Sequence, residues 1–269
     1  MKNPRSRLQL ALMAMALCVG MLDSLGADPD TSTHDLAKEL KNPVSSLTLL
    51  PFQFNVEVGS GEGHPVGTTL NIEPVVPINL NEDWRIITRV VAPVVYQESS
   101  IPRLDDTFGL SDMELSLFLA PVKKSEDSLV WGVGPIIEFP TTTDPLLGPE
   151  KWGIGPTAVL VKQMGCWTFG LLVNHLWSVG GAGLRDVNAT FIDPWMSYTW
   201  PSGFALNLES EITYDWEDSQ ATVPIRAGVS QLVTLGSQPV QFNLDGLYFF
   251  EHAPEGPEWG MSFTVTFVF

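Results

Sequence analysis

Hydrophobic and polar residues alternate along residues 259–269, at the end of the chain. One face of this segment carries large apolar side chains: Trp259, Met261, Phe263, Val265, Phe267 and Phe269. The positions between them carry mostly small or polar side chains: Gly260, Ser262, Thr264, Thr266 and Val268. Because successive side chains of a β-strand point to opposite faces, this pattern predicts a strand with one apolar face.

Residues 204–215 alternate in the same way. One face holds Leu206, Leu208, Ile212 and Tyr214, and the other holds Asn207, Glu209, Glu211, Thr213 and Asp215. Carboxylates spread along one face exclude a dry core between two sheets, since burying charge without partners is very unfavourable. A strand between lipid and a water-filled interior explains both faces.

The alternation continues through most of the chain and predicts about 12 strands, an even number as in bacterial outer-membrane barrels. Their expected ranges are 52–58, 68–78, 84–97, 110–121, 130–140, 153–162, 167–179, 188–200, 204–215, 223–233, 240–251 and 259–269. The links are long after most odd-numbered strands and short after most even-numbered ones, as in barrels with both chain ends in the periplasm. We therefore predict an all-β fold, a transmembrane antiparallel β-barrel, over residues 51–269.

Prolines and aromatic residues add detail to this barrel. Several prolines fall in or beside the predicted strands and should kink them, end their pairing or open a lateral gap for apolar solutes: Pro74, Pro77, Pro93, Pro135, Pro156, Pro194 and Pro224. Aromatic residues near strand ends are expected to form girdles at the two membrane interfaces. These are Trp84, Tyr96, Trp131, Trp152, Trp167, Trp177, Trp195, Trp200, Trp216 and Trp259.

The first 26 residues have the features of a cleaved export signal. Lys2, Arg5 and Arg7 precede an apolar run over residues 8–19, which is too short to cross a bilayer as a helix. Cleavage would leave Cys166 as the last cysteine in the chain, so an internal disulfide is excluded.

Residues 27–50 form a leader before the barrel. Leu36, Leu40 and Val44 recur every four residues, which predicts a short helix that Thr33 caps and Pro43 ends. Three arrangements are open for this leader: it lies on the membrane surface, it enters the periplasmic mouth of the barrel as a plug, or it stays flexible.

The chain is strongly acidic. It has 14 Lys and Arg against 31 Asp and Glu, a formal charge of −17. Removal of residues 1–26 takes away three basic residues and one acidic residue, so the charge becomes more negative still. Such a balance excludes nucleic acid as a partner, because nucleic-acid affinity comes from cations on phosphates. It suits solvated loops or a cavity that attracts cations.

Several stretches resemble a family of bacterial outer-membrane β-barrel "transporter" proteins of poorly defined function. This family is loosely related to barrels associated with phenol meta-cleavage pathways. The stretches are LAKELKNPVSSLTLLPFQ at 36–53, residues 70–97 around NIEPVVPINLNEDW, GPEKWGIGPTAVLVKQ at 148–163, and NHLWSVGG with RDVNATFIDPWMSYT at 174–199. The resemblance implies the outer membrane and a barrel, but no agreed substrate and no catalytic residues.

The candidate functional residues are charged side chains expected to face the lumen. They are Glu73, Arg85, Arg89, Asp112, Glu114, Glu209, Glu211, Arg226 and Asp245. Two interpretations are open: a polar pore that prefers cations, because rings of carboxylates favour them, or a sealed polar core in which acids and arginines pair across a narrow barrel.

We therefore expect an outer-membrane channel for passive passage of small solutes, either cations or aromatic and hydrophobic molecules. A non-conducting structural or adhesive barrel is the alternative. A barrel-embedded lipid hydrolase is more remote, because the odd spacing of His175 and Ser178 puts them on opposite faces of a regular strand. The scattered histidines predict no metal site, and no motif predicts a cofactor.

Partners are expected at the outer surface and at the C-terminal strand. Outer-membrane lipid should surround the barrel. The aromatic chain end resembles the signal that barrel assembly machinery recognises. Its residues are Phe263, Val265, Phe267 and Phe269.

Overall fold

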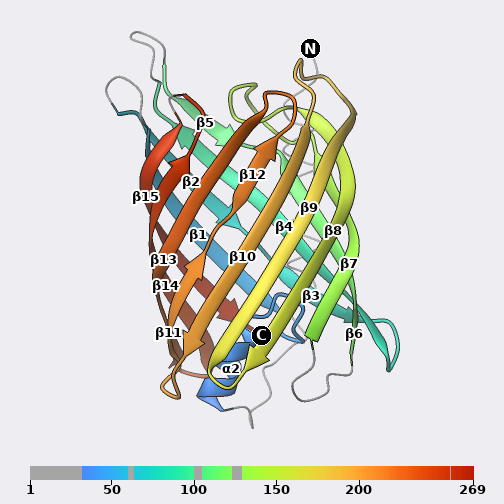
Figure 1. Ribbon diagram of the computed structural model, residues 1–269, viewed down its shortest axis with the longest axis vertical. Helices are drawn as coiled ribbons and strands as arrows, with labels where there is room; N and C mark the ends of the chain where they lie inside the picture. The colour runs from blue at the N-terminus through green and yellow to red at the C-terminus, as the bar shows by residue number, and fades with distance from the viewer. Residues whose placement is uncertain (1–31, 60–63, 100–104, 123–128, 255) are drawn as a thin grey trace.

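In the described part of the chain, a single antiparallel sheet closes on itself into a barrel, with one short helix at one end (Figure 1). The computed structural model describes residues 32–59, 64–99, 105–122, 129–254 and 256–269. The predicted all-β barrel of 12 strands with a short N-terminal helix is confirmed. The predicted export signal lies outside the described residues.

The strand positions follow from the alternation of side chains. The elements are α2 (Thr33–Glu39), β1 (Leu49–Gly59), β2 (Val66–Ile72), β3 (Val75–Asn79), β4 (Trp84–Gln97), β5 (Thr107–Leu110), β6 (Met113–Pro121), β7 (Leu129–Phe139), β8 (Lys151–Met164), β9 (Trp167–Gly181), β10 (Asn188–Thr199), β11 (Phe204–Glu209), β12 (Ile212–Asp215), β13 (Gln220–Leu235), β14 (Gln238–Glu251) and β15 (Pro257–Val268). Each predicted strand is found, and most extend a few residues further than predicted.

Over the described residues, three barrel strands are interrupted, so the 12 strands comprise 15 segments. β2 and β3 are separated at Pro74, which has no N–H to donate to a neighbouring strand. The other two breaks lie opposite prolines, where Ser111 N–H donates to the Pro93 carbonyl and Ser210 N–H to the Pro194 carbonyl. β3 and β12 still pair with β4 and β13, so the proline effect is a local break in pairing and the wall continues beyond it.

β15 pairs with β1 along its length and closes the barrel, with Phe263 opposite Phe54. Trp259, Met261 and Phe263 are 44–51% exposed on the outside, whereas Ser262 between them is 1% exposed and faces inward. An outer surface of large apolar side chains requires lipid around it. The barrel and its apolar exterior place the protein in the outer membrane.

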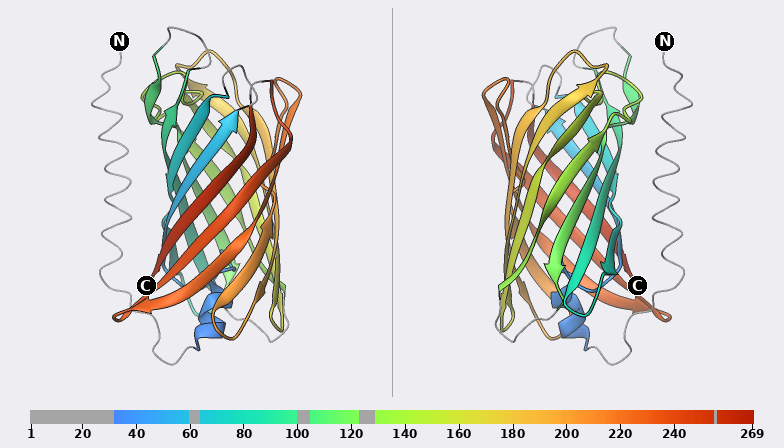
Figure 2. Two further views of the ribbon diagram at one scale, coloured as in Figure 1. Left: turned by 90° about the vertical axis from the view of Figure 1, so that its left-hand side faces the viewer. Right: turned by 90° about the vertical axis from the view of Figure 1, so that its right-hand side faces the viewer.

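Helix α2 lies at the end of the barrel that also holds the C-terminus (Figure 2). Its N-cap is Ser32, whose hydroxyl accepts a hydrogen bond from Asp35 N–H at 3.1 Å; the prediction of Thr33 was one residue late. We call this end periplasmic, following the barrel convention for short links and chain termini. No helix in the described part of the chain is long and apolar enough to cross a membrane.

Candidate functional site

Residues 33–48, which we call the plug, fill the periplasmic mouth of the barrel. Several of them are 0–1% exposed: Ala37, Asn42, Val44 and Thr48. The side-chain amide of Gln163 on β8 donates to the Lys38 carbonyl at 2.8 Å, and the indole N–H of Trp195 on β10 donates to the Lys41 carbonyl at 3.1 Å. Of the three arrangements expected for the leader, the structure therefore shows the plug.

The plug completes an apolar layer across the periplasmic part of the lumen. The buried members of this layer are Val44, Leu49, Val75, Ile87, Phe118, Ala120, Val130, Val159, Val161, Leu172 and Val268. Gly132 makes room for the plug, since a Cβ there would lie 3.0 Å from Val44 Cγ1 and 3.1 Å from Phe118 Cβ. Close packing of this kind excludes water and holds the plug in place.

Charged side chains follow toward the middle of the barrel. Arg89 on β4 pairs with Glu73 at 2.7 Å. Arg226 on β13 donates a hydrogen bond from Nη2 to the Glu211 carboxylate at 2.6 Å. Its Nε lies 3.9 Å from the Glu209 carboxylate. The breaks at β2/β3 and β11/β12 fall beside Glu73, Glu209 and Glu211, whereas Arg89 and Arg226 come from the continuous strands β4 and β13.

Lys41 brings a cation into the lumen from the plug. Its Nζ donates to the Ser230 hydroxyl at 3.0 Å and to the Gln241 amide oxygen at 3.4 Å. Burial lowers the pKa of Lys41 to about 8, although the carboxylates of Asp245 and Glu209 oppose this shift. The plug is therefore joined to the barrel by polar as well as apolar contacts.

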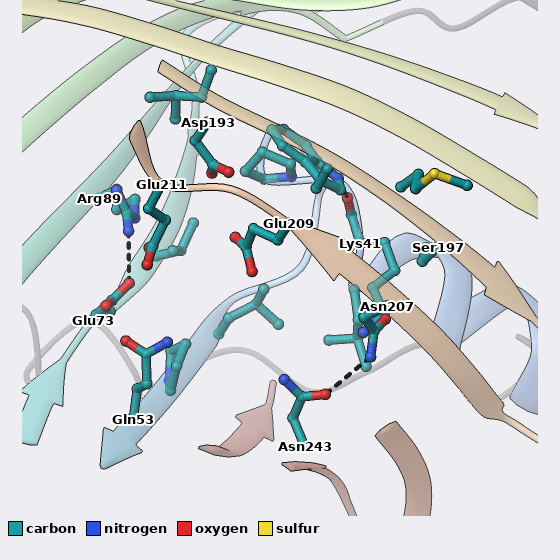
Figure 3. A pocket seen from close by; sticks show the side chains of 18 of the residues that line it. Lys41, Gln53, Glu73, Arg89, Asp193, Ser197, Asn207, Glu209, Glu211 and Asn243 are labelled. Atoms are coloured by element: carbon teal, nitrogen blue, oxygen red, sulfur yellow. Dashed lines mark hydrogen bonds and ion pairs between the residues drawn. The ribbon is translucent and has the colours of Figure 1, made fainter. Parts of the chain in front are cut away.

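A cavity of about 260 Å³, the inner cavity, lies between the plug and the charged side chains. Leu40, Lys41 and Pro43 of the plug line one part of it. Glu73, Arg89, Asp193, Glu209 and Glu211 line another, and Figure 3 shows the acids pointing into the same space. The inner cavity thus combines a floor of two apolar residues and one lysine with a predominantly acidic wall.

The predicted position of Trp195 in an aromatic girdle at the membrane interface is wrong. It faces the lumen, lines the inner cavity and packs against the apolar layer. Its ring lies against Gly170 on β9, where a Cβ would come far too close to the indole. The missing side chain of Gly170 therefore allows a tryptophan to lie flat inside the wall.

A second cavity, of about 620 Å³, lies among loops at the extracellular end. Glu138 on β7 borders it, together with parts of the loops at 145–150 and 183–187. Asp112 accepts hydrogen bonds from the backbone N–H groups of Thr142 and Glu150, both at 2.7 Å. Asp112 therefore fastens the loop after β7 to the barrel.

The predicted lumen residues fall into three groups. Glu73, Arg89, Glu209 and Glu211 line the inner cavity, and Arg226, Asp245 and Glu114 interact with this charged group. Asp112 lies toward the extracellular end. Arg85 lies toward the periplasmic end, within electrostatic reach of Glu39 in α2.

The predicted lumen residues leave out several that line the inner cavity, among them Lys41, Asp193, Trp195 and Ser197. Three of them lie at alternate positions on the inward face of β10, so alternation was the signal that could have found them. Pro194 and the apolar residues around it obscured that signal.

Three of the residues proposed for assembly, Phe263, Val265 and Phe267, lie on the outward-facing positions of β15. Phe263 stacks on Phe242 with ring centroids 6.3 Å apart, and Phe267 meets Phe52 edge-on at 6.2 Å. Phe269 follows the strand and exchanges backbone hydrogen bonds with Thr48.

The hydrolase alternative gains no support from His175 and Ser178. His175 packs against Trp177 with the two rings tilted by 51°, and its Nδ1 lies 2.7 Å from the Thr190 hydroxyl. Ser178 donates instead to Asp186 at 3.3 Å. Among the described residues, no group of three or more His, Cys, Asp or Glu side chains is placed to hold a metal ion.

The fold and the charged lumen define an outer-membrane β-barrel protein. Neither known protein families nor curated proteins match the chain. Among solved structures, it is similar to an outer membrane channel from Pseudomonas putida F1, at 16% identity over 83% of this chain and 96% of the channel, with a TM-score of 0.64. It is also similar to the NanC porin, at 13% identity over 82% of this chain and 98% of the porin, with a TM-score of 0.51. At these identities the likeness establishes a shared fold.

Proposed function

We propose that this protein is an outer-membrane channel for passive passage of small solutes, with a preference for cations. The observation that carries the proposal is the inner cavity with its acidic wall. Charge removed from bulk water destabilises a fold, so a purely structural barrel would be more stable with apolar side chains throughout. The shared fold with a channel and a porin supports the same function.

The preference for cations follows from the charges that face the inner cavity. Glu73, Asp193, Glu209 and Glu211 line it against two cations, Arg89 and Lys41. Arg89 is paired with Glu73, and Arg226 beside the cavity is paired with Glu211, which leaves Asp193 and Glu209 against Lys41. The remaining negative potential would concentrate cations and exclude anions.

The plug closes the periplasmic end in the state described by the structure. Passage of a solute therefore requires the plug to move, and its contacts set how often this occurs. The same close packing favours the second candidate function, a sealed structural barrel, in which the plug never leaves.

Conductance across a planar bilayer separates these functions. We expect the full chain to conduct in brief or small steps, and a variant without residues 33–48 to conduct in long, larger steps. Heat-dependent mobility on gels would verify that both barrels are folded. If neither folded protein conducts, the channel is rejected and the sealed barrel stands.

We also propose that the last strand directs the barrel to its assembly machinery. The outward-facing aromatic rings of Phe263 and Phe267 and the terminal Phe269 are accessible to a partner before lipid covers them. Replacing Phe269 with alanine should reduce the amount of folded barrel in outer-membrane fractions. Unchanged insertion would contradict this role.

A further inference from the structure

The inner cavity contains polar atoms without partners. Asp193 Oδ1, Ser197 Oγ and Asn207 Oδ1 are buried and have no hydrogen-bond partner among the described residues, and Ser197 is only 2% exposed. Ser197 and Asn207 are directly opposite each other on β10 and β11. Asp193 precedes Ser197 on the same face of β10. A buried oxygen without a partner is destabilising, so these groups are suited to a ligand that donates hydrogen bonds.

Both guanidinium groups beside the inner cavity, in contrast, already hold a carboxylate through Nη2, and the buried Arg226 Nε, which has no hydrogen-bond partner among the described residues, faces Glu209 at 3.9 Å. Arg89 is held by Glu73 at 2.7 Å, and Arg226 by Glu211 at 2.6 Å. The Asn207 side-chain N–H groups donate to Ser230 and Asn243. An anionic ligand would have to displace a glutamate from either arginine, whereas a cationic donor meets the open oxygen atoms of Asp193, Ser197 and Asn207.

Trp195 and Glu209 face the inner cavity from paired strands. They are directly opposite in the register of β10 and β11. The indole is fixed by its hydrogen bond to the Lys41 carbonyl and by the space above Gly170. Glu209 has Arg226 Nε only at 3.9 Å, and Figure 3 shows its carboxylate directed into the open space. An aromatic ring beside a carboxylate attracts an ammonium group, through the ring's quadrupole and through charge.

Two further observations narrow the class of cation. The described acids do not converge in a group that could hold a metal ion, which points away from a bare divalent cation. The chain itself places an alkylammonium, Lys41, at the floor of the same cavity. Apolar walls from Leu172 and Phe191 would contact the rest of such a molecule.

We propose that the inner cavity binds a small organic ammonium ion with an aromatic or aliphatic body. Its N–H groups would donate to Glu209 and Asp193, and its body would lie against Trp195 and Phe191. The ammonium site would define the solute class of the proposed channel. Only the transport of this solute rests on the proposed channel function, because binding can occur without conduction.

The test measures binding of 2-phenylethylammonium to the folded full chain in detergent, by titration calorimetry. The neutral analogue 2-phenylethanol, which has a hydroxyl in place of the ammonium, should bind at least about tenfold more weakly. Glu209→Gln keeps the shape of the side chain and should weaken binding of the ammonium ion by about tenfold or more. Glu217→Gln is the matched control, because it removes the same charge from an exposed turn after β12, and it should leave binding unchanged.

Asp193→Asn provides a second variant if Glu209→Gln does not fold. Equal binding of the ammonium ion and the alcohol would overturn the proposal, as would equal weakening by Glu209→Gln and Glu217→Gln, or absence of binding to the folded protein. Binding without conductance would keep the ammonium site and reject the channel. Conductance without binding would reject the ammonium site alone.

Discussion

The contact between Val44 and Gly132 sets how tightly the plug is held, and it can be altered from either side. Val44 is 1% exposed, and Val44→Ala removes two methyl groups at about 0.8 kcal/mol each, with a further term for the cavity left behind. We expect docking of the plug to weaken by about 2 kcal/mol, or about 30-fold. Gly132→Ala places a methyl group within 3.0–3.3 Å of Val44, Phe118 and Val159 and should weaken docking by about 1–3 kcal/mol.

The assay is labelling of a buried cysteine by a water-soluble maleimide. Ser45, which is 3% exposed, becomes Cys in a Cys166→Ser background, and Glu217→Cys serves as the exposed reference. If labelling requires the plug to leave, Val44→Ala should raise the relative rate by about 30-fold.

The double variant of Val44→Ala and Gly132→Ala tests the reasoning most sharply. The new methyl group occupies part of the space that the smaller side chain leaves. We therefore expect the double variant to label more slowly than the sum of the two single effects predicts, by about 1 kcal/mol of coupling. Unchanged labelling of Val44→Ala, or strictly additive effects, would refute the description of a close-packed plug.

Further predictions concern the charges and the extracellular loop. Burial in the docked plug lowers the pKa of Lys41 from its ordinary value of 10.5 to about 8. Between these pH values the undocked plug binds more protons than the docked plug, so docking should strengthen as pH rises from 8 to 10.5. Relative labelling at Ser45→Cys should fall over that range, and Lys41→Met should abolish the trend; a rise in labelling would contradict it. Arg226→Met leaves Glu209 and Glu211 without their cation and should lower the free energy of unfolding by about 2 kcal/mol in urea titrations. Glu211→Gln should partly restore it, and an unchanged midpoint would show that the ion pair does not stabilise the barrel. Asp112→Ala should speed hydrogen exchange at the amides of Thr142 and Glu150 by about tenfold, and equal protection would show that the carboxylate does not hold the loop.

The strands were predictable because the two sides of the wall face different solvents. Lipid outside and polar groups inside impose alternation on each strand, as in Trp259, Met261 and Phe263 against Ser262. The same alternation predicts that Glu73, Arg89, Glu209 and Glu211 face the lumen, and all four line the inner cavity. The order of neighbouring residues along each strand is enough to predict which face of the wall these side chains occupy.

The inner cavity itself depends on contacts between distant parts of the chain. Lys41 reaches Ser230 and Gln241 across most of the sequence, and no local pattern predicts such a contact. Trp195 was assigned to the interface because tryptophan is common there, but the absence of a side chain at Gly170 on the neighbouring strand turns this region into a pocket. The breaks in pairing were foreseen from proline, although their positions depended on which proline faces which strand.

The reversal potential of the channel in a KCl gradient tests the central claim most directly. The variant without residues 33–48 removes the plug and Lys41, so the acids of the lumen face the passing ions. We predict a reversal potential of the sign for cation selectivity, which moves toward zero in Glu209→Gln with Glu211→Gln and stays unchanged in Glu217→Gln. A folded, conducting barrel that selects anions, or keeps its selectivity without both glutamates, would contradict the claim that this acidic wall controls passage.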